Sequence, residues 1–304
     1  MNKTDVSRRI RYKMNQWLES IKDQSLRAKV KQNYLVSGGA IVSLLCDDEP
    51  KDYDVYIQDM DTCIELSKYY LKEATMPKIQ VLDGRRKDEY LEAYNNSDGN
   101  KKTLAIKNLY DNQVKIAFNG KIRVKKDKKG MYPKYTPLFI SENAISLSNK
   151  VQVITRFVGT AEVIHSSFDF VHATNYFTSK DGLVLNPKAL ECIISKVLLY
   201  QGSKFPLTSL IRVKKFIKRG WDISSGEMLK IMFQVSKLDL SDIGVLEQQL
   251  IGVDVLYFHK LIEVINKSNA TGEPINEDDL FVYIDGIFNE DNEEEEDDED
   301  DMTE

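Results

Sequence analysis

Residues 34–58 read YLVSGGAIVSLLCDDEPKDYDVYIQ, and this stretch decides the fold. A short apolar strand over residues 34–36 stops at Ser37-Gly38-Gly39, and an apolar helix over residues 40–46 begins directly after the two glycines. Beyond an acidic turn, residues 52–58 have the alternation and β-branched content of a second strand, and a further helix follows. The order of strand, glycine turn, helix, strand and helix predicts one compact α/β unit.

Two features of this unit point to phosphate chemistry. Glycines at a strand-to-helix turn let the backbone approach a polyphosphate closely, and amides there lie at the positive end of the helix. Asp52 and Asp54 are two positions apart on a strand, so their carboxylates share one face. Paired carboxylates suit Mg²⁺, which proteins commonly share with substrate phosphates. The candidates for holding a nucleoside triphosphate and its metal ions are therefore Ser37, Gly38, Gly39, Asp52 and Asp54.

This arrangement resembles the signature of the DNA polymerase β-like nucleotidyltransferase superfamily, which includes the poly(A) polymerases and CCA-adding enzymes. The resemblance covers residues 34–58 by motif and residues 150–175 by pattern. It implies a third carboxylate on a later strand, and Asp169, between Phe168 and Phe170, is the best candidate. Bacterial members usually follow the glycines with Val-Arg-Asp, where this chain has Ile41-Val42-Ser43. That departure points away from tRNA end repair and toward a divergent viral or mobile-element member.

The resemblance implies an enzyme that transfers a nucleoside monophosphate from a triphosphate such as ATP and releases pyrophosphate. It also implies Mg²⁺ as cofactor, with Mn²⁺ as an alternative, and an RNA 3′ hydroxyl as the expected acceptor. Asp52 and Asp54 would ligate both ions, and Asp169 would assist the ion that activates the attacking hydroxyl. In relatives, Lys and Tyr side chains of the helical region contact the nucleotide. The corresponding candidates, the first two placed four residues apart on one predicted helix, are Lys196, Tyr200, Arg212 and Lys215.

Other functions stay open at this point. A degenerate member of the same superfamily would act as a nucleic-acid-binding or assembly protein without catalysis. A catalytic member could instead modify a protein hydroxyl or a small molecule. A zinc site of His165, Asp169 and His172 would require a helix, whereas the alternation of Phe168 and Phe170 favours a strand.

The charge of the chain has two separate parts. The whole sequence carries −6, but residues 290–304 contain twelve acidic side chains and no basic one. Residues 1–289 therefore carry 42 basic and 36 acidic side chains, a net charge of +6. Basic clusters at residues 121–134 and 212–219 predict contact with RNA or another nucleic acid, and the alternative is a solvated face. The acidic tail either solubilises the chain or competes with nucleic acid for the basic body.

The predicted class is α+β: a nucleotidyltransferase-like palm with a mixed β-sheet flanked by helices, then a mainly helical domain and a disordered acidic tail. The three predicted parts are a catalytic domain at 1–183 with a basic insertion at 84–135, a helical domain at 184–289, and the tail at 290–304. An Asn119-Gly120 turn signal predicts a hairpin of 113–118 with 121–126. The spacing of apolar residues predicts a helix at 4–32, further sheet at 138–157 and 163–171, and helices at 189–200, 207–218, 226–235 and 256–266.

Composition excludes several classes of protein. The three cysteines lack CxxC spacing, which argues against a disulfide framework and a cysteine zinc site. No apolar run reaches the roughly 18 residues of a membrane span. The expectation is an intracellular protein without a membrane partner, located in the host cytoplasm if it is viral.

Overall fold

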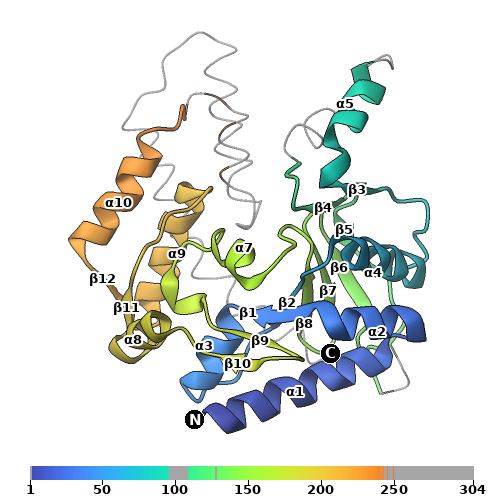
Figure 1. The fold of residues 1–304 in the computed structure, drawn as a ribbon, viewed down its shortest axis with the longest axis horizontal. Coiled ribbons are helices and arrows are strands. Elements are labelled where there is room, and N and C mark those ends of the chain that lie inside the picture. Colours follow the sequence, from blue (N-terminus) through green and yellow to red (C-terminus); the bar gives the residue numbers. More distant parts are fainter. Residues whose placement is uncertain are drawn as a thin grey trace. The chain divides into compact units, whose positions relative to one another are not determined.

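The structure is a computed structural model, and it describes residues 2–95, 109–126 and 129–240, together with residues 242, 245 and 249. The chain divides into two compact units, Met1–Gln201 and Gly202–Glu304. The first unit confirms the predicted α+β class, because a large mixed sheet is flanked by helices (Figure 1). The predicted helix at 256–266 and the tail at 290–304 lie outside the described residues.

The main sheet of the first unit has eight strands in the order β10-β9-β1-β2-β8-β7-β6-β5. Its strands are β1 (Tyr34–Ser37), β2 (Tyr53–Ile57), β5 (Gly120–Lys121), β6 (Pro137–Ile140), β7 (Ala144–Leu147), β8 (Val151–Ile154), β9 (Tyr176–Thr178) and β10 (Gly182–Val184). β2 and β8 are parallel, and the other neighbouring pairs are antiparallel. Sheet pairing over β6 to β8 confirms the strand prediction for residues 138–157.

Helices and short elements complete the first unit. Its helices are α1 (Lys3–Ser20), α2 (Gln24–Asn33), α3 (Gly39–Leu45), α4 (Met60–Glu73), α5 (Lys87–Asn95), α7 (Ala161–His165) and α8 (Pro187–Ser195), with 3₁₀ turns at Gly84–Arg86 and Val171–Ala173 and the short strand β11 (Val197–Leu198). The prediction of one helix over residues 4–32 is wrong in its length. Ile21 has an extended backbone, and the Asp23 side chain accepts from the Leu26 amide, so a new helix begins there.

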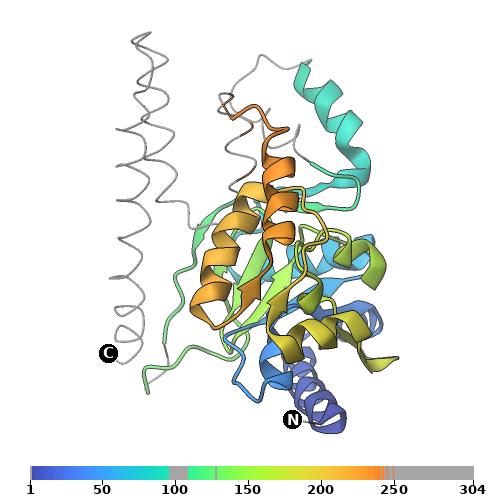
Figure 2. The same cartoon turned by 90° about the vertical axis from the view of Figure 1, so that its left-hand side faces the viewer.

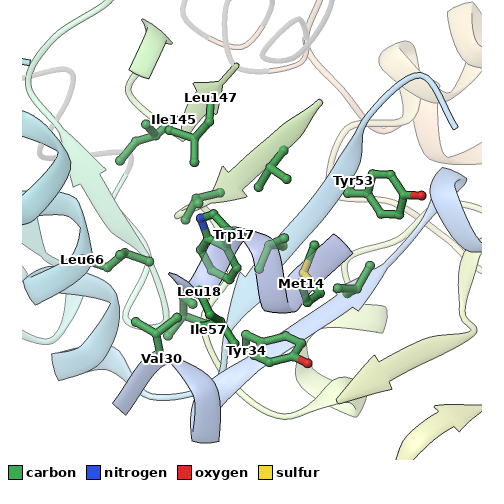
Figure 3. Packing of buried hydrophobic residues seen from close by; sticks show 14 of the residues in the cluster. Met14, Trp17, Leu18, Val30, Tyr34, Tyr53, Ile57, Leu66, Ile145 and Leu147 are labelled. Carbon is green, nitrogen blue, oxygen red and sulfur yellow. The ribbon is translucent and has the colours of Figure 1, made fainter. Parts of the chain in front are cut away.

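The main hydrophobic core lies between one face of this sheet and the helices α1, α2 and α4 (Figure 3). The residues labelled in that view are Met14, Trp17, Leu18, Val30, Tyr34, Tyr53, Ile57, Leu66, Ile145 and Leu147. Full burial of one large apolar side chain stabilises the fold by about 1.5–3 kcal/mol. The indole of Trp17 donates to the Tyr70 hydroxyl at 2.8 Å, which satisfies a polar group inside this core.

The opposite face of the sheet is packed more sparingly. Leu35 of β1, Tyr56 of β2 and Ala161 and Ile164 of α7 form a smaller buried cluster there. Because side chains alternate along β2, Asp54 lies on this face with Tyr56, and Val55 lies on the face of the main core. The face covered by α1, α2 and α4 therefore supplies most of the hydrophobic core, and the face covered by α7 carries the candidate carboxylate Asp54.

The predicted hairpin over residues 113–126 is wrong. β4 (Val114–Ile116) pairs with β3 (Val81–Asp83) in a separate two-stranded sheet, whereas β5 pairs with β6 of the main sheet. The buried ammonium of Lys115 on β4 lies 2.8 Å from the Glu142 carboxylate. Partners far away in the sequence thus decide the pairing, and the local Asn-Gly turn signal does not.

The described part of the second unit contains α9 (Pro206–Lys218), β12 (Asp222–Ile223) and α10 (Ser225–Val235). α9 and α10 pack against each other, as the neighbouring gold and orange ribbons show in Figures 1 and 2. They confirm the helices predicted over residues 207–218 and 226–235. No helix within the described ranges is both long and apolar enough to cross a membrane.

Candidate functional site

The glycine turn between β1 and α3 lies beside the carboxylate of Asp54. Gly38 has φ 85° and ψ −149°, a backbone conformation that is essentially restricted to glycine. A β-carbon added at Gly38 would lie 3.4 Å from Oδ2 of Asp54. Gly39 differs, because it is exposed and an added β-carbon would contact nothing within 4 Å. The structure therefore brings together two of the predicted site residues, Gly38 and Asp54.

Asp54 belongs to a polar row that crosses three strands. The parallel register places Asp54 of β2 beside Gln152 of β8, and the antiparallel register places Gln152 beside Ser146 of β7. Nε2 of Gln152 donates to Oγ of Ser146 at 3.0 Å. Residues in register share a face of the sheet, so Gln152 and Ser146 accompany Asp54 on the α7 face. The sequence reasoning missed Gln152 and Ser146, although a lone Gln within the alternating Val151–Ile154 was a usable signal.

Asp52 directly precedes β2 and shares the alternation that places Asp54 on its face. Its side chain is exposed by surface area, yet the protein packed around the carboxyl removes part of its water and raises its pKa. The positive charges of Lys51 and Lys150 act in the opposite direction. A metal cation bound beside Asp52 would likewise lower the pKa of Asp52, because a nearby positive charge stabilises the carboxylate.

Ser37 is fully buried, and its hydroxyl is engaged within the protein. Its Oγ lies 2.8 Å from the Asn175 carbonyl oxygen and 2.9 Å from Nε2 of His165. A hydroxyl has one proton to donate, so when Asn175 accepts it, Nε2–H of His165 donates to Oγ. The amide of Gly38 donates to the carbonyl of Ala173 at 3.2 Å. The start of the turn is thus tied to residues 173–175, and Gly39 is its exposed position.

Asp169 lies in a different setting from the predicted strand. The prediction of sheet over residues 163–171 is wrong, because α7 continues to His165, irregular backbone follows, and a 3₁₀ turn begins at Val171. Phe170 forms only an isolated bridge with Tyr200, and its ring packs against that tyrosine. Phe168 packs against Tyr56 on the sheet. The alternation therefore reflects two aromatic anchors in separate clusters, with the buried Asp169 between them.

The three predicted metal carboxylates do not form one cluster. Across the described parts of the chain, no group of three His, Cys, Asp or Glu side chains is placed to hold a metal ion. α7 ends at His165, so the helical face that a His165–Asp169–His172 zinc site requires is not formed. Proteins commonly hold Mg²⁺ through one or two carboxylates plus substrate phosphates, and Asp52 and Asp54 fit that donor set. The metal roles of Asp52, Asp54 and Asp169 stay predictions.

The predicted pairing of Lys196 and Tyr200 on one helix face is wrong. α8 ends at Ser195, and Lys196 caps it with φ 55°, in the left-handed region. Tyr200 is buried and forms the bridge with Phe170, whereas the Lys196 side chain is exposed. A helix that stops one turn early thus separates the two side chains.

The remaining candidate cations are exposed. Arg212 and Lys215 lie on α9 of the second unit. The described cations of residues 121–134 are also exposed, and Nζ of Lys126 lies 5.3 Å from the ring centroid of Tyr132. Lys128 lies outside the described residues. Nucleic-acid binding by the two basic clusters stays a prediction.

His172, which is buried, and His165, which is half-buried, predict a loss of stability in mild acid. Burial lowers the pKa of His165 and of His172 from 6.5 to about 4, although the charge of Asp169 opposes the shift at His172. The unfolded chain then binds protons at a higher pH than the folded chain, so stability is complete above about pH 6.5 and falls toward pH 4. His172→Gln should remove up to about 3 kcal/mol of that pH dependence. Urea midpoints measured across this range test it, and an unchanged slope would contradict it.

The sequence also matches a described protein family. Residues 8–196, most of the first unit and well over half of the chain, match the family described as Gabija anti-defense 2 family protein. The chain belongs to this family. The protein named Gabija anti-defense 2 from Bacillus phage SPbetaL7 is 28% identical over 117 residues, which cover 38% of this chain and 29% of that protein. The phage source of that relative agrees with the general prediction that this chain is a viral family member.

Solved CCA-adding enzymes resemble this Gabija anti-defense 2 family member only weakly, in both TM-score and sequence identity. The Thermotoga maritima CCA-adding enzyme complexed with tRNA has a TM-score of 0.35 and 12% identity, with 72% of this chain and 44% of that chain covered. A CCA-adding enzyme with ATP has a TM-score of 0.39 and 12% identity, with 78% and 46% covered. The chain thus spans less than half the length of each of these proteins and of the phage relative.

Proposed function

We propose that this protein is a Mg²⁺-dependent nucleotidyltransferase that moves a nucleoside monophosphate from a triphosphate to an RNA 3′ hydroxyl, releasing pyrophosphate. The observation that carries this proposal is the contact between the glycine turn and a carboxylate. Oδ2 of Asp54 lies where a β-carbon of Gly38 would be in van der Waals contact, and Asp52 follows the same alternation. The sequence spacing predicted that a phosphate-binding turn and acidic ligands would share a site.

Each part of this site has a defined task in the proposed reaction. Asp52 and Asp54 would hold the ion, which when bound would neutralise charge on the triphosphate. The backbone at Gly39 is exposed, so it can approach a phosphate oxygen without a side chain in the way. Gln152 lies in register with Asp54, which places an amide group beside the carboxylate and within the same row. Positioning and charge neutralisation supply most of the catalysis in such transfers.

The family description adds a biological setting to this chemistry. Its name refers to counteraction of a defence called Gabija. We place the proposed transfer in that setting, in which a nucleotide added to an acceptor would block the defence. RNA is the acceptor favoured by the +6 charge of residues 1–289, because a basic body attracts a polyanion.

Purified full-length protein should incorporate label from at least one nucleoside triphosphate into mixed RNA when Mg²⁺ is present. Products resolved by length would show extension of RNA, and mass spectrometry of the same mixture would reveal a nucleotide on a protein or small molecule instead. Chelation of Mg²⁺ should abolish incorporation. If the RNA keeps its mass and a protein becomes nucleotidylated, the proposed transfer reaction stands and the proposed RNA acceptor is overturned.

A second candidate is a catalytically inactive fold of the same type that acts through binding alone. Two observations favour it: the amide of Gly38 already donates to Ala173, and Asp169 does not join Asp52 and Asp54 as a third ligand within the described residues. Calorimetric titration separates the candidates. An enzyme should bind a triphosphate only with Mg²⁺, whereas an inactive fold should show no such binding.

A further inference from the structure

A cavity of about 480 Å³ lies beside α1 in the first unit. Its lining residues are Lys3, Thr4, Ser7, Arg8, Arg11, Asp181, Gly182 and Leu183. α1 contacts the edge strand β10, and Figure 1 shows α1 passing beneath β9 and β10 in that view. The predicted site residues are absent from this lining, so the cavity lies outside the proposed triphosphate site.

The lining is strongly cationic on the side of the helix. Lys3, Ser7 and Arg11 are spaced by four residues and form one stripe of α1. In the described part of the chain, neither Lys3 nor Arg11 forms an ion pair. The guanidinium of Arg11 lies over the ring of Phe177, 5.4 Å from its centroid, which restricts a long side chain. Two uncompensated cations and a hydroxyl therefore border the same space.

The other two charged lining groups already have partners. Arg8 lies 2.6 Å from the Asp5 carboxylate, and both are on the helix surface. The carboxylate of Asp181 accepts from the Thr178 hydroxyl at 3.0 Å. The cavity therefore keeps a positive net charge, because Lys3 and Arg11 face one carboxylate once Arg8 is paired with Asp5.

The strand side of the cavity lacks a side chain at Gly182. Gly182 has φ 67°, and a β-carbon built there would lie 3.9 Å from Nη2 of Arg11 and 3.9 Å from Oγ of Ser7. A ligand group can therefore approach these two donors without meeting a side chain at residue 182. Leu183 is the only apolar side chain in the lining, so the cavity offers donors and no aromatic face for a base.

We propose that this cavity binds a backbone phosphate of single-stranded RNA. Guanidinium, ammonium and hydroxyl groups are the donors that phosphate oxygens accept, and contacts of this kind position a nucleic acid without reading its bases. The residues of α1 pack on the main-core face of the sheet, whereas Asp54 lies on the opposite face. The cavity is thus separate from the proposed triphosphate site, and it would hold a part of the RNA away from the reacting end.

The test measures RNA binding by full-length protein without nucleotide or Mg²⁺, so it does not depend on catalysis. Fluorescence anisotropy with a labelled single-stranded RNA at low salt should show about tenfold weaker binding for the double variant Lys3→Gln/Arg11→Gln. The slope of log affinity against log salt should fall by about 0.7, because one phosphate contact is lost. Lys68→Gln/Lys72→Gln on α4 removes the same net charge from two exposed positions and should change affinity little.

The control separates a site from a general charge effect. Equal weakening in both double variants would overturn the cavity as a binding site, and so would unchanged affinity in Lys3→Gln/Arg11→Gln. Calorimetry with pyrophosphate completes the comparison. If pyrophosphate binding falls in that variant while RNA affinity stays constant, the cavity takes a free phosphate compound, and the RNA proposal is overturned. Thermal melting of each variant verifies that both remain folded.

Discussion

Replacing Asp54 with Asn should reduce nucleotide incorporation at least about 100-fold, the equivalent of about 2.7 kcal/mol in the barrier. The substitution keeps the size of the side chain and removes the negative charge beside the glycine turn. Asp54 is half-buried in β2, and its Oδ2 lies close to Gly38. Loss of that charge removes a ligand for the ion and with it the neutralisation of the triphosphate.

Asp48→Asn is the matched control for this prediction. Asp48 is an exposed carboxylate in the turn that follows α3, and it lies outside the polar row. The control variant should keep incorporation within about twofold of the wild-type rate, since an isolated surface charge is worth little. Circular dichroism should show that Asp54→Asn is folded. Full incorporation by that folded variant would contradict the assignment of Asp54 to the site.

Gly38→Ala should destabilise the protein by about 1–3 kcal/mol and abolish nucleotide binding, whereas Gly39→Ala should leave the stability unchanged. At Gly38 the backbone has φ 85°, which a residue with a β-carbon adopts only with strain. The same β-carbon would lie 3.4 Å from Oδ2 of Asp54 and would occupy space beside the carboxylate. At Gly39, the first residue of α3, an added β-carbon has open space and alanine favours the helix.

Urea unfolding of the two variants measures this difference directly. The pair is informative because both glycines lose the same single hydrogen and gain the same methyl group. Similar unfolding midpoints for the two variants would contradict the conformation assigned to Gly38. A stable Gly38→Ala that still binds triphosphate with Mg²⁺ would remove the glycine turn from the proposed site.

Local sequence signals predicted the elements that depend on near neighbours. The Gly-Gly turn, the strand before it and the strand carrying Asp54 were all placed correctly, because a glycine break and an alternating apolar pattern constrain only a few consecutive residues. Helices α9 and α10 were predicted for the same reason, since their apolar residues recur with helical spacing. The predicted domain bounds at 183 and 289 stay predictions, and the compact units meet between Gln201 and Gly202.

Predictions that depended on distant partners were the ones that changed. The Asn119-Gly120 turn signal was outweighed by pairing of β4 with β3 and of β5 with β6, across residues far apart in the chain. The alternation of Phe168 and Phe170 indicated burial correctly and strand pairing wrongly, because Tyr56 and Tyr200 anchor the two rings in different clusters. A periodic pattern reports which side chains are buried, and it carries no information on what covers them.

The sequence by itself determined the glycine turn and the two carboxylates of Asp52 and Asp54, because their spacing along one short unit fixes a shared strand face. Only the tertiary structure decided that Gly38, and not Gly39, contacts Asp54, and that Gln152 and Ser146 continue the row. It also decided that Lys3, Ser7 and Arg11 border a cavity with Gly182. These arrangements depend on strand register and helix packing, which local sequence patterns do not specify.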